Sequence, residues 1–295
     1  MDHSICCSDY ADLPVAACAR FSEEQTVENR SNAASMKKNR NQEAPRLGFS
    51  TGGAISSRTA MLDEIEALLA IVPPEAEAEQ YRRAILDDNA LHKATASNRE
   101  KTFKFLRRLY GLDPALCLFR EFRRLYRFAA DDSRLLIGLL AMAREPVLRD
   151  CLEMVRSVPV GESLDRQNFE AWIRAHAPGQ FSESMYVSFS HNLYATFYQL
   201  GYLGESVGKA RSRNRPKVGI ASATYAAFLD SLQGLSGLSL LHGTYSRALD
   251  LGVDDHLALL KAAGKQGLLK VAYSGGVLEL GFPGFLTADE KRITP

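Results

Sequence analysis

Short links between amphipathic helices are the feature that most constrains what this chain of 295 residues can fold into. From Gly111 to Val158 one helical pattern of apolar residues follows another, with only a few residues between them. Several links carry a helix-start signal, such as Asp113-Pro114 before one helix and Pro146 before another. Helices with such short connections pack side by side as a bundle. The sequence therefore predicts a mainly α fold, with helices over residues 97–110, 115–129, 133–142 and 147–155.

The first of these helices combines a start signal, an apolar face and a dense group of cations. Ser97 is expected to be the N-cap and Glu100 to complete a capping box, while Gly111 is placed to end the helix in a left-handed conformation. Its apolar residues follow helical spacing: Phe103, Leu106, Leu109 and Tyr110. Its basic residues, with one just upstream, are Lys93, Arg99, Lys101, Lys104, Arg107 and Arg108. The helix should therefore bury one face and present positive charge on the other.

The next helix repeats this bias. Its arginines are spaced i, i+3, i+4 and i+7 and so share one helical face: Arg120, Arg123, Arg124 and Arg127. Between His92 and Arg134 there are eleven Lys or Arg residues against five Asp or Glu residues, a local excess of six, although the net charge of the protein is only +1. Two adjacent basic helices favour nucleic acid as a partner. The alternative is two solvated faces on which arginine stems cover apolar surface.

Two further helices are expected upstream, over residues 55–71 and 75–87, with Pro73-Pro74 ending the first. The segment before them contains Thr51-Gly52-Gly53. A Gly-rich loop before a helix can cradle a phosphate. This loop lacks both the lysine of a P-loop and the Rossmann spacing, so an ordinary turn is the preferred interpretation. Together these elements define a predicted N-terminal helical bundle with a basic face over residues 48–160.

A second module, winged-helix-like, is expected over residues 161–223. After a helix over residues 163–175, Ser182 starts another helix that runs to Leu200. Its polar side includes His191 and Asn192, and the hairpin-like segment behind it is typical of the wing that follows a recognition helix. Asparagine can read adenine in a major groove, although polar helix faces are common on any protein surface.

A row of cations follows this helix. Every second residue is basic, and the residues between them are small, apart from Asn214 and Pro216; the cations are Lys209, Arg211, Arg213, Arg215 and Lys217. In an extended segment the period of two residues would place all five cations on one side. Pro216 favours a loop or a wing over an internal strand. Because no acidic residue separates these like charges, the pattern favours an anionic partner. A loop that only improves solubility is the alternative.

The third predicted module covers residues 224–286. Helices are expected over residues 224–232, 238–249 and 256–263, followed by a hairpin of residues 268–272 and 277–282 that turns at Gly275-Gly276. The order of helices and hairpin is again winged-helix-like. Because this hairpin carries little charge, we expect it to serve the fold or to contact another protein. Residues 287–295 are expected to form a polar tail.

The N-terminal segment, the cysteines and the longest apolar run indicate the setting in which the protein works. Residues 1–47 are polar and without periodicity, which predicts a disordered tail, and its Lys37, Lys38 and Arg40 could form a basic arm on DNA. Five cysteines, with no zinc-binding spacing, indicate a reducing, cytoplasmic setting. The longest apolar run, Leu135–Ala143, is about half of the roughly 20 residues that a membrane span needs, so no membrane association is expected.

Signatures of catalysis are missing from the sequence. It contains no G-x-S-x-G, H-E-x-x-H, P-loop or zinc-ribbon pattern. The six histidines are scattered without a carboxylate or cysteine at ligand spacing, and the paired aspartates precede or flank helix starts, where caps explain them better than metal binding does. We therefore expect no enzymatic activity, no cofactor or metal, and no small-molecule substrate.

Several blocks of the chain resemble the BrxA family of the BREX bacteriophage-exclusion systems. The Thr-Gly-Gly segment of residues 49–54 precedes the first helix as it does in that family. A second block matches the pattern Asn-x-x-x-Lys-x-Thr-x-Ser followed by Arg-Arg-Leu-x-x-Leu: Asn89, Lys93, Thr95, Ser97, Arg107, Arg108, Leu109 and Leu112. Pro146–Asp150 and Gly201–Leu203 match further positions, so the resemblance extends over residues 48–230.

The resemblance implies a NusB-like helical bundle joined to winged-helix-like modules with small β-hairpins. It also implies a non-catalytic, DNA-binding role in an antiphage complex with other BREX proteins. Together with the cation clusters it predicts binding of duplex DNA, chiefly through phosphates. Two alternatives are an RNA-binding, antitermination-like factor and a protein–protein scaffold of the defence complex. The residues expected to contact DNA are Lys93, Arg99, Lys101, Lys104, Arg107, Arg108, Arg120, Arg124, His191, Asn192, Lys209, Arg211, Arg213, Arg215 and Lys217.

Overall fold

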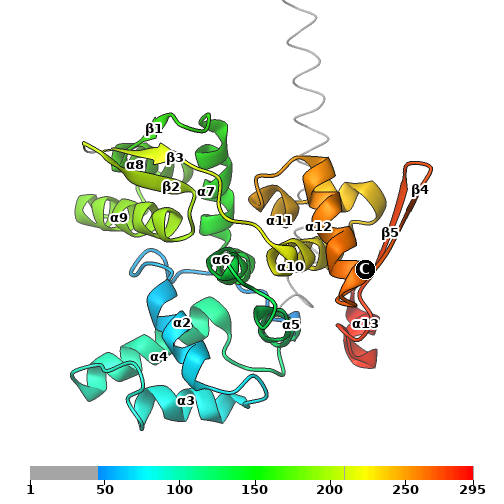
Figure 1. The fold of residues 1–295 in the computed structure, drawn as a ribbon. Coiled ribbons are helices and arrows are strands. Elements are labelled where there is room, and N and C mark those ends of the chain that lie inside the picture. Colours follow the sequence, from blue (N-terminus) through cyan, green and yellow to red (C-terminus); the bar gives the residue numbers. More distant parts are fainter. Residues whose placement is uncertain (1–45, 209, 295) are drawn as a thin grey trace, which may run out of the picture. The chain divides into compact units, whose positions relative to one another are not determined.

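Two helices that are buried on every side, α6 (Ser133–Arg144) and α10 (Ile220–Ser231), lie at the centre of the computed structural model (Figure 1). The structure describes residues 46–208 and 210–294, all within one unit that begins at Pro45. Every residue of α6 from Leu135 onward is buried, as is α10 from Ala221 to Asp230. A helix that is almost wholly apolar around its circumference is stable only inside a core.

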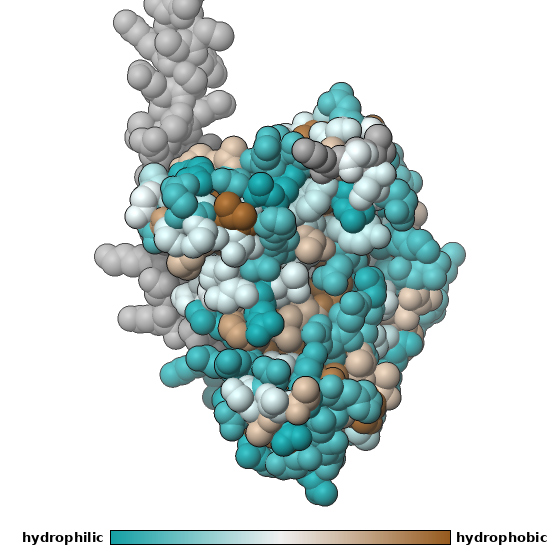
Figure 2. Space-filling view, turned by 90° about the vertical axis from the view of Figure 1, so that its left-hand side faces the viewer, coloured by the Kyte–Doolittle hydropathy of each residue, from teal (hydrophilic) through white to brown (hydrophobic). Residues whose placement is uncertain are grey.

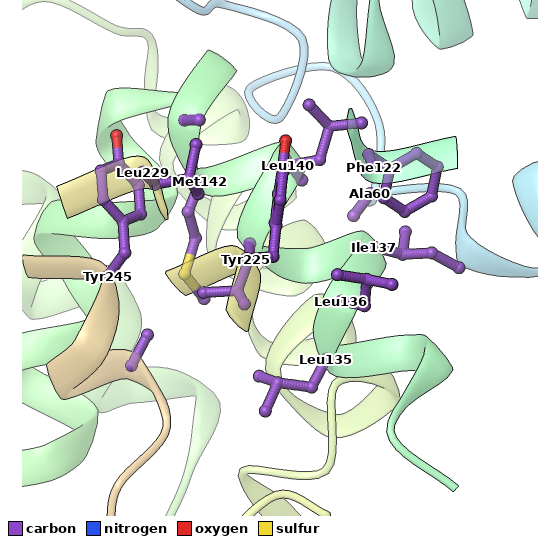
Figure 3. Packing of buried hydrophobic residues seen from close by; sticks show 14 of the residues in the cluster. Ala60, Phe122, Leu135, Leu136, Ile137, Leu140, Met142, Tyr225, Leu229 and Tyr245 are labelled. Carbon is purple, nitrogen blue, oxygen red and sulfur yellow. The ribbon is translucent and has the colours of Figure 1, made fainter. Parts of the chain in front are cut away.

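The side chains between these two helices interdigitate. Figure 3 shows Leu136, Leu140 and Met142 of α6 beside Tyr225 and Leu229 of α10. The Tyr225 hydroxyl, which is fully buried, donates a 2.9 Å hydrogen bond to the carbonyl oxygen of Leu118. A buried phenol needs such a partner. The contact ties α10 to the helix that contains Leu118.

The remaining helices of the N-terminal bundle pack on α6 or on one another, which confirms the mainly α fold. They are α2 (Leu62–Ile71), α3 (Ala78–Leu86), α4 (Ala96–Tyr110), α5 (Cys117–Tyr126) and α7 (Pro146–Ser157). The helix predicted from residue 55 begins only at Leu62, because residues 55–61 form an irregular loop that ends with Met61 at a φ of 53°. The helix predicted from residue 115 begins at Cys117; the Asp113 carboxylate caps the turn before it by accepting from the Ala115 amide at 2.9 Å.

A module of two helices and a small three-stranded sheet follows α7, and its order of elements is that of a winged helix. The elements are β1 (Ser163–Leu164), α8 (Arg166–His176), α9 (Glu183–Gln199), β2 (Leu203–Val207) and β3 (Ala210–Arg213). The strands pair antiparallel in the order β1-β3-β2. The helix predicted over residues 163–175 therefore starts later, because Ser163 and Leu164 pair with β3. The predicted N-cap of α9, Ser182, is confirmed.

The C-terminal part packs on the other side of α10 (Figure 1). It contains the 3-10 helix η1 (Gly237–His242), α11 (Thr244–Ala248), α12 (Val253–Lys265), the hairpin β4 (Lys270–Ser274) and β5 (Val277–Gly281), and α13 (Ala288–Ile293). The hairpin is as predicted, whereas the single helix expected over residues 238–249 is divided into η1 and α11 at Gly243. The predicted tail includes α13. The predicted boundary at residue 223 falls inside α10.

Buried carboxylates connect these parts through backbone amides. Asp132, expected to cap α6, makes no side-chain cap to its own helix. It accepts instead from the backbone amide and the hydroxyl of Ser222, at 2.9 and 2.7 Å, and so caps α10. Gly219 lies against the Asp132 carboxyl group, which a Cβ atom at that position would approach to 2.7 Å. Asp230, at the far end of α10, accepts from the amides of Tyr245 and Ser246.

We predict that Asp132→Ala lowers the free energy of unfolding by about 1–3 kcal/mol, since it leaves the Ser222 amide buried without an acceptor. Urea denaturation measures this change. The neighbouring Asp131→Ala is the matched control: the Asp131 side chain is 85% exposed and pairs with Lys217 only at 3.8 Å. It should change stability by no more than about 0.5 kcal/mol. Equal losses in both variants would contradict the anchoring role of Asp132.

His256 predicts how stability changes with pH. Its side chain is 1% exposed on α12, and burial lowers its pKa to about 4. The unfolded chain therefore takes up a proton near pH 6.5 that the folded protein does not accept until about pH 4. The contribution of His256 to stability should therefore fall by about 1.4 kcal/mol per pH unit as the pH drops through this window. Burial raises the pKa of Asp230 to about 6, which contributes with the opposite sign over part of the same range, so the variant isolates the histidine. Urea titrations of His256→Leu should lack this component, whereas the control His191→Gln, at an exposed histidine, should keep it.

Candidate nucleic-acid interface

Helix α4 is positioned by a cap at each end and by one buried face. Thr95 rather than Ser97 is its N-cap, since the Thr95 hydroxyl accepts from the Asn98 amide at 3.2 Å. At the other end Gly111 has a φ of 88°, which confirms the predicted helix stop and favours glycine there. The face turned to the core consists of Thr102, Leu106, Leu109 and Tyr110.

Opposite the buried face, α4 exposes Lys101, Lys104 and Arg107, which we name the α4 basic face. None of the three side chains makes a hydrogen bond or ion pair with another residue that the structure describes. Successive members are three residues apart, a spacing at which like charges on a helix repel one another. Glu100 is the only acidic residue in α4. This face is therefore a concentration of uncompensated positive charge.

Arg108, the next cation of α4, is also exposed but is hydrogen-bonded within the protein. Its Nε donates to the carbonyl oxygen of Gly52 at 2.8 Å, which joins α4 to the Thr-Gly-Gly loop. The amides of Gly53 and Ala54 in that loop both donate to the buried Glu145 carboxylate at 2.8 Å. The donors that could have held a phosphate are thus occupied by a carboxylate of the protein. The interpretation of this loop as a structural turn fits these contacts.

The loop continues between α4 and α9. Asn192 of α9 donates to the carbonyl oxygen of Ile55 at 3.0 Å, and the Thr196 hydroxyl accepts from the Ala60 amide at 3.0 Å. Between these contacts, the exposed guanidinium of Arg58 lies 5.6 Å from the ring centre of Phe105 on α4. The view onto this side is largely hydrophilic (Figure 2). Arg58, which no periodic pattern singled out, thereby adds a cation beside α4, whereas Asn192 has a structural partner.

His191 lies on the exposed side of α9, as predicted for a recognition helix. Nearby, Arg211 of β3 places its guanidinium 3.6 Å from the ring centre of Tyr198 and donates to the Gly204 carbonyl oxygen at 2.9 Å. The Tyr198 ring is itself 38% exposed. This part of the winged-helix module therefore presents an aromatic ring and a cation, but α9 itself contains neither Lys nor Arg.

The row of cations predicted over residues 209–217 does not form one exposed side, which corrects that prediction. Arg213 is 1% exposed; its Nε donates to the Val155 carbonyl oxygen at 3.0 Å and its Nη2 pairs with Asp250 at 2.6 Å. A DNA phosphate cannot reach it without unfolding this contact. Arg215 and Lys217 are exposed and near carboxylates at 4.0 and 3.8 Å, respectively. Lys209 lies outside the described residues.

Other predicted contact residues are also occupied by carboxylates. Lys93 pairs with Glu64 at 3.2 Å. Arg120 pairs with Glu290 at 2.7 Å, and Arg124 pairs with Glu121 at 2.8 Å and stacks over Phe285 at 3.7 Å. The arginine side of α5 is thus covered in part by the C-terminal segment, which the helical spacing could not indicate. Arg99 is half-buried at the start of α4.

Neither protein-family models nor curated proteins match this chain. Among solved structures, an uncharacterized protein from Magnetospirillum magneticum is similar, with 17% sequence identity and a TM-score of 0.47 over 62% of this chain and 95% of that chain. No helix of the described residues is long and apolar enough to cross a membrane. The described part also contains no group of three or more His, Cys, Asp or Glu side chains arranged to bind a metal.

We predict that Arg213→Ala destabilises the fold by roughly 3 kcal/mol, because it removes a buried partner of Asp250. Arg215→Ala, two residues away, should change stability by less than about 1 kcal/mol, since the Arg215 side chain is 66% exposed. Urea denaturation of the two variants compares them directly. A stable Arg213→Ala protein would show that the buried ion pair contributes little.

Proposed function

We propose that this protein is a non-catalytic, cytoplasmic DNA-binding component of a BREX antiphage system and that it grips duplex DNA through phosphate contacts of the α4 basic face. The observation that carries the proposal is the absence of a partner for Lys101, Lys104 and Arg107 within the described residues. Most other clustered cations are paired or hydrogen-bonded internally. Side chains left free in this way are the ones that a polyanion can engage.

The energetics of such a face suit a nucleic-acid backbone. Repulsion between like charges three residues apart destabilises the free helix by a few tenths of a kcal/mol per pair. A duplex removes this repulsion and releases the counterions condensed on its phosphates, which gives affinity that is steep in salt and independent of sequence. Arg58 beside Phe105 would extend the contact toward α9. The exposed His191 is the residue of α9 that we propose approaches the DNA from the winged-helix side.

The role in phage exclusion rests on the family resemblance of residues 48–230, which includes the Thr-Gly-Gly loop and the Arg107-Arg108 block of α4. The resemblance also supports other BREX proteins as partners. One observation favours a second candidate, single-stranded nucleic acid or RNA: the exposed Tyr198 ring under Arg211 could stack on an unpaired base. Competition between duplex DNA, single-stranded DNA and RNA for the protein distinguishes these candidates.

The decisive experiment removes the α4 basic face. The triple variant Lys101→Ala, Lys104→Ala, Arg107→Ala should bind duplex DNA more weakly whatever its sequence. The dependence of log K on log salt should become shallower by up to about 2.7, which corresponds to about 0.9 for each of the three lost phosphate contacts. Fluorescence anisotropy at several salt concentrations measures both quantities.

A matched control removes the same charge elsewhere. Lys265, Lys270 and Lys291 are exposed in the C-terminal part, and their triple alanine variant should keep the affinity and the salt dependence of the parent. If both triple variants weaken binding equally, only the total charge matters and the α4 basic face is not the site. If the parent shows no binding to duplex DNA at low salt, the proposal fails altogether.

A further inference from the structure

A second group of arginines lines a cavity that the proposed DNA surface does not use. The cavity has a volume of about 160 Å³ and lies against α5, at the loop that joins α2 to α3. Four of the residues that line it are Arg120, Arg123, Arg124 and Arg127, and the others are Pro74, Glu75 and Pro114. Neither proline has an amide N–H, and the side-chain donors at this cavity are the guanidinium groups.

Arg123 is the unusual member of this group. It is only 4% exposed, yet none of the described carboxylates forms an ion pair with it. Its Nη2 donates to the Val72 carbonyl oxygen at 2.7 Å, and its guanidinium lies 6.0 Å from the ring centre of Tyr81. Its buried Nε has no hydrogen-bond partner among the described residues. Arginine is rarely buried without a counter-charge, because desolvation of the cation is costly.

The neighbouring charges leave room for an anion. Arg120 and Arg124 are paired with Glu121 and Glu290, but the buried Nη2 of Arg124 still lacks an acceptor. Arg127 is exposed and makes no ion pair with a described residue. Glu75 is the only acid that lines the cavity. A water molecule could accept from these N–H groups, but it could not compensate the charge of Arg123.

We propose that this cavity binds a small phosphate-class oxyanion, held by Arg123, Arg124 and Arg127. Guanidinium groups match the oxygens of a phosphoryl group with paired, charge-assisted hydrogen bonds. Three arginines converging on one cavity suit the several acceptor oxygens of such a group better than a single carboxylate. The site does not depend on the proposed binding of DNA, because it uses none of the residues of the α4 basic face.

Titration calorimetry of the full chain with inorganic phosphate, at constant ionic strength against sodium chloride, tests this site. We expect saturable binding of phosphate, and weaker binding of malonate, a dicarboxylate that lacks the tetrahedral arrangement of oxygens of a phosphoryl group. Arg127→Gln, at an exposed position on the cavity wall, should weaken phosphate binding on the order of tenfold, the equivalent of about 1.4 kcal/mol for one charge-assisted contact. Glu75→Gln should strengthen it, which a loss of folding could not imitate.

Arg83→Gln is the matched control, because Arg83 is exposed and does not line the cavity; it should bind phosphate like the parent. Failure of the parent to bind phosphate would overturn the proposal, as would malonate binding as tightly as phosphate. Unchanged binding in both Arg127→Gln and Glu75→Gln would also overturn it. Arg127→Gln should keep its affinity for DNA within about twofold, and the α4 triple variant should keep its affinity for phosphate, so the two proposals fail independently.

Discussion

The fold depends on two buried carboxylates at the ends of α6. Asp132 precedes the helix and holds the first turn of α10, while Glu145 follows it and holds the amides of Gly53 and Ala54. Each bond joins segments about 90 residues apart in sequence. A carboxylate buried in this way is tolerated only if donors surround it, and each charge-assisted bond contributes roughly 1.5–3 kcal/mol. The apolar α6 lies in the core, and the carboxylates at its two ends hold α10 and the Gly53–Ala54 loop in place.

The cations that contact the core are likewise satisfied by hydrogen bonds or ion pairs. Arginines that contact the core are satisfied there: Arg144 donates to the Gly48 carbonyl oxygen and Arg108 to that of Gly52. Arg213 is tied to Asp250 across the junction between the winged-helix module and α11. Once these contacts are made, much of the local excess of positive charge has become part of the architecture. The unpaired cations on α4 and around Arg123 are therefore the candidates for binding an anionic partner.

Many ends of helices and strands were predicted correctly from local sequence signals. Pro73-Pro74 ends α2, Ser182 begins α9 and Gly275-Gly276 turns the C-terminal hairpin, because each of these signals acts through the residues next to it. The same local reasoning failed where two local solutions compete. Thr95 and Ser97 are both good N-caps, and the Thr95 hydroxyl is the one that accepts from the Asn98 amide. Likewise, Ser163 and Leu164 became a strand because β3 was available to pair with them.

The sequence by itself determined the helical class, the stop signals and the helical faces on which cations gather, since these depend on neighbouring residues or on the period of 3.6 residues along one segment. Only the tertiary structure decided which cations are free. Glu290 reaches Arg120 from 170 residues away and Glu64 reaches Lys93 from 29 residues away. The periodicity of one segment cannot indicate an ion pair with a residue so far away in the sequence. Lys101, Lys104 and Arg107 stay exposed and form no ion pair with a described carboxylate, which depends on packing rather than on spacing.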